Sequence, residues 1–231
     1  MREELGLRHH RVRYGHSVRL INQLLRMVYC ETKLDQGEQF LSHVMTDETY
    51  IQLGKNSRTC FVKNRHEAVH PAPKHVPKVL LWAGISVEGG CPIKIFRGKD
   101  SIVDSSKYQA ILHEKYLNWS RNTFGSSAVL VQDWAPAHSS QSTKLYLERS
   151  GIRVENWPPE SADLNPIETV WALLKRWLTN SWKPKNLDQL EEGIHYWWDN
   201  HLSKDLCIRL IERMQTKMRQ ILAKSGRPCP D

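Results

Sequence analysis

The sequence of 231 residues predicts an α/β protein in which helices flank a mixed β-sheet. Three observations lead to this fold class: strand-like segments come first, short strands then alternate with helices, and a run of helices ends the chain. The apolar fraction of 40% and the charged fraction of 25% indicate a folded protein with a sizeable core. No segment of the sequence reaches the roughly 18 apolar residues that a membrane-spanning helix needs, so we expect no membrane association.

The first half of the chain predicts one helix followed by several strands. Within residues 17–34, apolar side chains recur at helical spacing, at Val18, Ile21, Leu24, Leu25 and Val28. Runs rich in β-branched and aromatic residues then predict strands over residues 43–53, 59–63, 78–87 and 92–97. The proline-rich segment 70–77 is predicted to be a loop, because proline lacks an amide donor.

The second half predicts alternating helices and strands, and then three helices. Helices are expected over residues 104–119, 139–150, 165–180, 187–200 and 203–224. Short strands are expected over residues 128–133 and 152–157. Asp104 is a suitable N-cap, and Gly151 follows a helix where a C-terminal glycine is common. The last helix carries one apolar stripe, which we expect to dock on the core: Leu206, Leu210, Met214, Met218 and Leu222.

The charge balance favours a polyanionic partner. Lysine and arginine number 33 against 25 aspartates and glutamates, which makes the net charge +8. Cations near phosphates release counterions and so drive binding to nucleic acids. Three arginines of the N-terminal arm are candidate nucleic-acid contacts: Arg8, Arg11 and Arg13. A solvated tail is the alternative for this arm.

The cysteines and the N-terminus indicate the compartment. The five cysteines are scattered and form no C-x-x-C pair, so we expect neither a disulfide framework nor a cysteine-rich zinc site. The first 16 residues contain no apolar segment, and we therefore expect no secretory signal. These features favour a reducing compartment, the cytosol or the nucleus.

Three carboxylates stand near the ends of predicted elements. Asp47 lies in a strand-like run, where aspartate is disfavoured, and an exposed turn is the alternative. Asp133 ends a short apolar strand, at the edge where α/β sheets gather their sites, or it simply marks the strand end. Glu168 follows Asn165 and Pro166 at the start of a helix, where a capping box is the alternative.

Together these carboxylates match the chemistry of a divalent-metal site. Mg²⁺ and Mn²⁺ prefer oxygen ligands, and a pair of such ions can act on both oxygens of a phosphodiester displacement. Three carboxylates in one place would repel each other without metal, which raises their pKa values.

The segments that carry Asp133 and Glu168 resemble the DDE catalytic domain of mariner-type (Tc/mariner superfamily) transposases. The resemblance rests on residues 129–133, on Pro136 and His138, and on residues 157–171. It extends over about residues 35–200, and the 34 residues between Asp133 and Glu168 match one major branch of the superfamily. His138 recurs in the family pattern, although a helix-start histidine that bonds to backbone is the alternative.

This resemblance implies a ribonuclease H-like fold and an acidic triad of Asp47, Asp133 and Glu168. It implies an enzyme that cleaves transposon ends and joins the freed 3′-hydroxyl to target DNA. The triad would hold Mg²⁺ or Mn²⁺, with two ions expected. DNA is the expected partner, together with a second copy of the chain as a homodimer, and the nucleus is the expected location.

The same resemblance divides the chain into three parts. Residues 1–34 are expected to be a basic arm and linker helix, the remnant of a region joining N-terminal DNA-binding domains. Residues 35–200 are expected to form the catalytic domain, and residues 201–231 a C-terminal basic amphipathic helix and tail. Lys175 and Arg176 follow Glu168 and are further candidate phosphate contacts, with a solvated helix face as the alternative.

The residues directly after Asp133 depart from the family pattern. The family usually has asparagine, a polar residue and proline, whereas this chain has Trp134 and Ala135 before Pro136. With the DNA-binding domains expected to be missing, this departure supports an alternative function. The alternative is a truncated or catalytically silent, transposase-derived DNA-binding or interaction protein, and a stand-alone nuclease is a third hypothesis.

Overall fold

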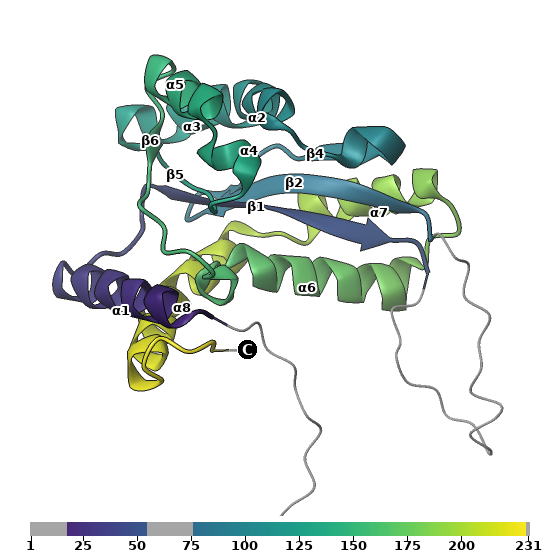
Figure 1. Cartoon of the computed structure of the whole chain (residues 1–231). Coiled ribbons are helices and arrows are strands. Elements are labelled where there is room, and N and C mark those ends of the chain that lie inside the picture. Colours follow the sequence, from purple (N-terminus) through teal and green to yellow (C-terminus); the bar gives the residue numbers. More distant parts are fainter. Residues whose placement is uncertain (1–17, 55–75, 230–231) are drawn as a thin grey trace, which may run out of the picture.

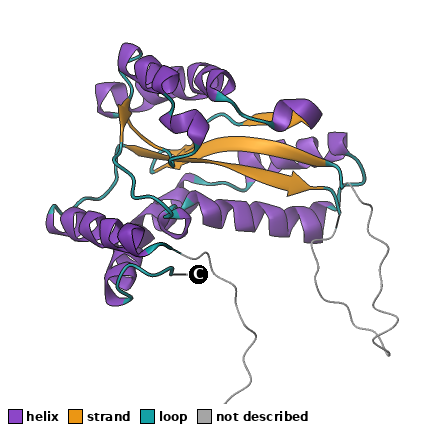
Figure 2. Cartoon of the chain, in the orientation of Figure 1, coloured by secondary structure: helices purple, strands orange, loops and turns teal. Residues whose placement is uncertain are grey.

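The structure, a computed structural model, describes residues 18–54 and 76–229. A mixed sheet forms the middle layer, and helices cover both of its faces (Figures 1 and 2). The helices α2 to α5 lie over one face, and α6 and α7 lie over the other together with α1 and α8. The predicted α/β fold class is therefore confirmed.

The sheet is built around β1 and β2, its two long strands. The strands are β1 (His43–Gln52), β2 (Lys78–Ser86), β3 (Gly89–Gly90), β4 (Lys94–Arg97), β5 (Val129–Val131) and β6 (Arg153–Val154). Their order is β3-β2-β1-β5-β6, and β4 also pairs with β2. β1 is antiparallel to β2 and parallel to β5, which is itself parallel to β6.

The strands predicted within the described residues are present, although several are shorter than expected. The strands predicted at residues 128–133 and 152–157 extend over only three and two residues, as β5 and β6. A tight turn at residues 87–88 joins β2 to β3. The strand predicted at residues 59–63 lies outside the described residues, as does most of the proline-rich loop.

Helices form where apolar periodicity and capping residues predicted them. They are α1 (Leu20–Asp35), α2 (Ser105–Ile111), α3 (Asn118–Phe124), α4 (Pro136–Ser139), α5 (Gln141–Arg149), α6 (Ile167–Trp177), α7 (Leu187–Asn200) and α8 (Lys204–Ala223). The Asp104 side chain accepts a 2.8 Å hydrogen bond from the Lys107 amide and so caps α2, as expected. A wider π-helical segment, Leu112–Leu117, joins α2 to α3, so the helical stretch continues to Phe124.

Side chains alternate between the two faces of the sheet along each strand, and a hydrophobic core lies on each face. Leu81 and Ala83 of β2 face the larger core, which includes Trp171 of α6 and Met214 of α8. Trp82 between them faces the smaller core under α2 and α5. The C-terminal helix α8 buries most of its predicted stripe in the larger core, which confirms that it docks there.

The first helix turns its apolar stripe outward. α1 buries Asn22, Arg26, Tyr29 and Cys30 instead. The exposed residues of the stripe are Ile21, Leu24, Leu25 and Val28, with Leu20 beside them. The apolar spacing therefore predicted the helix correctly but did not predict its buried face, which is set by packing against α8.

Two further expectations concern the cysteines and the membrane. Cys30, Cys91, Cys207 and Cys229 are free thiols in the interior. Of the helices that the structure describes, none combines the length and apolar character needed to cross a membrane.

Candidate active site

Strand register brings the two aspartates to the same edge of the sheet. β1 and β5 run parallel, with Met45 beside Val131. Two residues further along lie Asp47, within β1, and Asp133, two residues past the end of β5, so the two aspartates reach the same level of the sheet. The Thr46 hydroxyl donates a 2.6 Å hydrogen bond to the Val131 carbonyl and holds the two segments together at this point.

The third carboxylate reaches this edge from the first turn of α6. The side-chain amide nitrogen of Asn165, Nδ2, donates a 3.2 Å hydrogen bond to the Thr46 carbonyl, which ties the start of α6 to β1. The Asn165 side-chain oxygen accepts from the Ile167 amide at 3.3 Å. In a capping box the Asn165 backbone amide would donate to the Glu168 carboxylate, but this amide donates to the Ala162 carbonyl at 3.0 Å instead. The Glu168 carboxylate is thus available for another role.

Asp47 is buried among other carboxylates. Burial first, and then the negative charges of Glu168, Glu48 and Asp133, together raise the pKa of Asp47 to about 8. The Trp171 indole donates a weak 3.4 Å hydrogen bond to Asp47 Oδ2. Partial desolvation also raises the pKa of Glu168, against the opposing positive charge of Lys175. The site therefore concentrates more negative charge than its neighbours neutralise.

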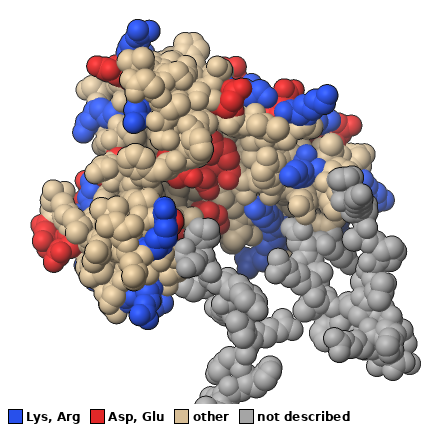
Figure 3. Space-filling view, viewed as in Figure 1, with Lys and Arg blue, Asp and Glu red and all other residues tan. Residues whose placement is uncertain are grey.

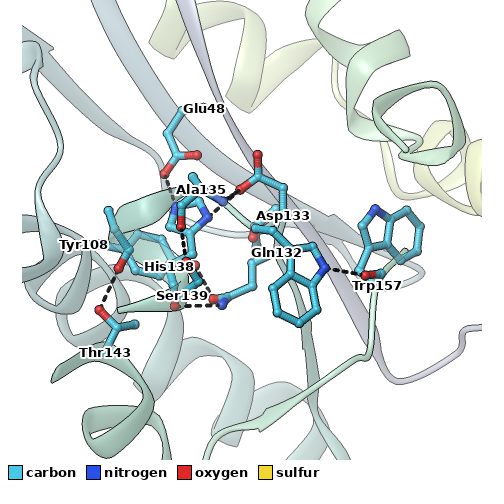
Figure 4. A network of polar contacts seen from close by, with 12 residues as sticks. Glu48, Tyr108, Gln132, Asp133, Ala135, His138, Ser139, Thr143 and Trp157 are labelled. Carbon is cyan, nitrogen blue, oxygen red and sulfur yellow. Dashed lines mark hydrogen bonds and ion pairs between the residues drawn. The ribbon is translucent and has the colours of Figure 1, made fainter. Parts of the chain in front are cut away.

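His138 connects Asp133 to a fourth carboxylate, Glu48 (Figure 4). Its Nδ1 lies 2.7 Å from Asp133 Oδ1, and its Nε2 lies 3.2 Å from Glu48 Oε1. Because both ring nitrogens face carboxylate oxygens, both donate, and the ring is an imidazolium. Burial lowers the pKa of His138, but the bonds to Asp133 and Glu48 outweigh burial and raise it to about 10.

Asp133 is held in a fixed position by this contact. Its Oδ1 also accepts a 2.9 Å hydrogen bond from the Ala135 amide. Burial raises the pKa of Asp133, whereas the bonds from His138 and Ala135 lower it, and the net shift is downward. Asp133 is therefore ionised, and its second oxygen, Oδ2, is the one that can face a cation.

Glu48 and Tyr108 are site residues that reasoning from the sequence missed. Glu48 follows Asp47 in β1, so its side chain points to the opposite face, toward α4. The Tyr108 ring packs against the His138 ring with centroids 3.9 Å apart, and its hydroxyl donates to Gln132 at 2.6 Å. Strand alternation could have placed Glu48, whereas nothing local to Tyr108 indicates its contact with His138.

Of the predicted phosphate contacts, Lys175 and Arg176 lie within the described residues. The Lys175 ammonium group donates a 2.6 Å hydrogen bond to the Thr49 hydroxyl, and burial lowers its pKa although Glu168 and Asp47 oppose this. Arg176 is exposed on the same helix. In Figure 3 acidic side chains gather at the centre of the face over β1, and basic side chains lie below them over α6. Arg8, Arg11 and Arg13 lie outside the described residues.

The donor set fits a divalent cation. Carboxylate oxygens are the ligands that Mg²⁺ and Mn²⁺ prefer, and the raised pKa of Asp47 reports repulsion that a cation would relieve. Among residues 18–54 and 76–229, no three acidic, histidine or cysteine side chains converge closely enough to hold an ion as they stand.

Comparison with known proteins agrees with this geometry. Residues 42–191, more than half of the chain, match the family model described as DDE superfamily endonuclease. The chain is 28% identical over 180 residues to the Transposable element Tcb2 transposase of Caenorhabditis briggsae, covering 75% of this chain and 66% of that protein. It is 24% identical over 210 residues to the Transposable element Tc1 transposase of Caenorhabditis elegans, covering 89% of this chain and 76% of that protein. The chain thus spans about two thirds to three quarters of these relatives.

Solved structures share the fold. The mariner Mos1 paired end complex with Mg matches with a TM-score of 0.84 at 18% identity, over 99% of this chain and 69% of that one. The catalytic domain of Mos1 mariner transposase matches with a TM-score of 0.74 at 17% identity, over 94% and 99%. These matches confirm the expected ribonuclease H-like fold. The chain therefore belongs to the DDE superfamily endonuclease family and contains the DDE catalytic domain of a Tc1/mariner-type transposase.

Proposed function

We propose that this chain cleaves DNA at transposon ends and joins the freed 3′-hydroxyl to target DNA in the nucleus. The observation that carries the proposal is the meeting of Asp47 and Asp133 in register at one sheet edge, with Glu168 tied to β1 through Asn165. This arrangement supports the transposase function over a catalytically silent protein, because the carboxylates remain together although Trp134 and Ala135 depart from the family pattern.

Asp47, Asp133 and Glu168 would hold the metal, expected to be two Mg²⁺ or Mn²⁺ ions. When bound, such ions supply Lewis-acid chemistry to a phosphodiester displacement. The protein itself holds Asp133 ionised through His138 and the Ala135 amide. Lys175 and Arg176 on α6 would contact the phosphate backbone beside the carboxylates.

Partner and domain assignments belong to the same proposal. A net charge of +8 and the match to a Mos1 paired-end complex with a transposon end support DNA as the partner. The paired-end arrangement of that relative also supports a homodimer for this chain. We place the chemistry in residues 35–200, with residues 1–34 as an arm and linker helix and residues 201–231 as a C-terminal helix and tail.

Calorimetric titration with MnCl₂ tests the metal assignment. Wild-type protein should bind Mn²⁺, and Asp133→Asn or Glu168→Gln should weaken binding about tenfold or more, a loss of about 1.4 kcal/mol or more. Asp199→Asn is the matched control, because it removes an exposed carboxylate on α7. Equal binding by wild type and Asp133→Asn would contradict the assignment.

A strand-joining assay tests the reaction. A labelled oligonucleotide with a free 3′-hydroxyl is incubated with supercoiled plasmid, MnCl₂ and the protein, and label should transfer to the plasmid. An oligonucleotide with a dideoxy 3′ end should give none, because it lacks the attacking hydroxyl. Nicking without joining would favour the nuclease hypothesis, and neither reaction would favour the silent protein.

A further inference from the structure

Trp134 is a large aromatic side chain held at the surface beside the candidate active site. It follows Asp133 directly, and 54% of its area is exposed. Its indole Nε1 donates a 2.7 Å hydrogen bond to the Trp157 carbonyl, drawn as a dashed line in Figure 4. This bond fixes the orientation of the ring, so a flat apolar face is already positioned for stacking.

The ring lies between two hollows that share the walls Trp134, Glu155 and Asn156. The smaller hollow, of about 420 Å³, is also lined by Asp133 and His138. The larger hollow, of about 690 Å³, lies between α1 and residues 155–159. Trp134 thus lies between the hollow lined by Asp133 and the larger hollow beside α1.

The lining of the larger hollow suits a nucleobase. Tyr29 and Trp157, both largely buried, add aromatic surface to its wall beside the exposed ring of Trp134. The side-chain amides of Asn22 and Gln36 supply hydrogen-bond donors and acceptors, like those of a base edge. Aromatic faces combined with polar groups of this kind recognise unpaired bases in single strands.

The interior of a duplex cannot use this ring, because both faces of each base there are covered by stacked neighbours. A base must be unpaired before its face can contact Trp134. The mariner pattern has a small amide at this position, so the ring adds a surface that the pattern does not provide.

We infer that Trp134 stacks on an unpaired base of the DNA strand held at Asp133, and that the larger hollow receives this base. This inference rests on the proposed function, because it names how DNA is positioned at the same carboxylates. Trp134 is a positioning residue that sets which nucleotides beside the reacting phosphate must be unpaired.

Fluorescence anisotropy in EDTA tests the inference without any cleavage. The probes are a short fluorescein-labelled single-stranded oligonucleotide of mixed sequence and the same strand annealed to its complement. Trp134→Ala should weaken binding of the single strand about 5-fold to 150-fold, the range measured for removing one base–aromatic stack. Binding of the duplex should change less than about twofold, and Trp134→Phe should retain most of the single-strand affinity.

The matched control is Tyr196→Ala, which removes an exposed aromatic ring on α7 that lines neither hollow. It should leave both affinities unchanged. In a second measurement, 2-aminopurine placed in the single strand should be quenched by wild type and less so by Trp134→Ala. Circular dichroism should show that each variant is folded.

Three results would overturn the inference: equal weakening for both probes, no weakening with Trp134→Ala, or no measurable single-strand binding by wild type. The proposed function fails separately, in the MnCl₂ and strand-joining experiments, which do not depend on this preference. If the protein joins strands but Trp134→Ala does not weaken single-strand binding, the stacking role is overturned and the proposed function stands.

Discussion

At the scale of single residues, neighbouring carboxylates have opposite pKa shifts because their partners differ. Asp47 is buried near Glu168 and Glu48, and its pKa rises to about 8. Asp133 receives hydrogen bonds from His138 and Ala135, and its pKa falls. His138 supplies a positive charge between Asp133 and Glu48 and so offsets part of the repulsion.

The Glu155 carboxylate makes the stability of the fold depend on pH in the acid range. Its carboxylate lies 3.0 Å from Lys33 Nζ and 2.9 Å from His43 Nε2. Burial raises the pKa of Glu155, but the bonds from His43 and Lys33 lower it more, and the net shift is downward. Because the folded-state pKa lies below the unfolded value of about 4.3, Glu155 stabilises the fold above that pH, and this stability is lost as pH falls through the folded-state pKa.

Glu155→Gln should therefore flatten the decline of stability below about pH 4.3, and it should also lower stability at neutral pH. Urea unfolding at a series of pH values measures this. Glu212→Gln, an exposed carboxylate on α8, is the control and should keep the wild-type profile. A Glu155→Gln profile parallel to that of wild type would contradict this role.

At the scale of elements, close approach of helices depends on small residues. Gly193 of α7 faces the π-helical segment Leu178–Trp182 that follows α6. An added Cβ would lie 2.5 Å from the Trp182 ring, whose indole donates a 2.7 Å hydrogen bond to the Gln189 carbonyl. The ring also stacks on Tyr196, with centroids 5.4 Å apart, so it cannot move freely.

Gly193→Ala should destabilise the protein by up to about 2 kcal/mol. Overpacking costs about 1–3 kcal/mol, and it exceeds the gain of about 1 kcal/mol that alanine brings to a helix. Chemical denaturation followed by tryptophan fluorescence measures the change. Glu192→Ala, exposed on the same helix, is the control and should be nearly neutral. A Gly193→Ala variant as stable as wild type would show that Trp182 can shift.

At the scale of the whole molecule, Arg26 joins three distant segments. Its guanidinium on α1 is fully buried and forms hydrogen bonds of 2.7 Å and 2.8 Å with both oxygens of Asp163, before α6. It also donates to the carbonyl of Gly226, after α8, at 3.0 Å. One side chain thus holds both ends of the described chain to the segment that precedes Glu168.

Arg26→Ala should lower the free energy of unfolding by about 3–5 kcal/mol, because it leaves the carboxylate of Asp163 without its buried partner. Thermal and urea unfolding measure the loss. Arg19→Ala is the matched control on the same helix, since Arg19 pairs with Glu160 at the surface and should matter little. If the two variants lost equal stability, the buried pair would not be the main link between these segments.

Much of the fold and part of the site could be predicted from local patterns. The strand runs, the Asp104 cap and the apolar periodicity of α6 to α8 act through neighbours a few residues away, so they can be read along the chain. The positions of Asp47 within a strand, Asp133 just after a strand and Glu168 in the first turn of a helix follow from the same patterns together with the family motif.

Other features depend on contacts between residues far apart, and only the three-dimensional structure decides them. α1 turns its apolar stripe outward because its other face packs against α8, and there Arg26 meets Asp163, a residue 137 positions away. Glu48 joins the site because β1 alternates and His138 arrives from α4. Trp134 points away from the Asp133 carboxylate because the Trp157 carbonyl accepts its hydrogen bond, and no local pattern in the sequence encodes that partner.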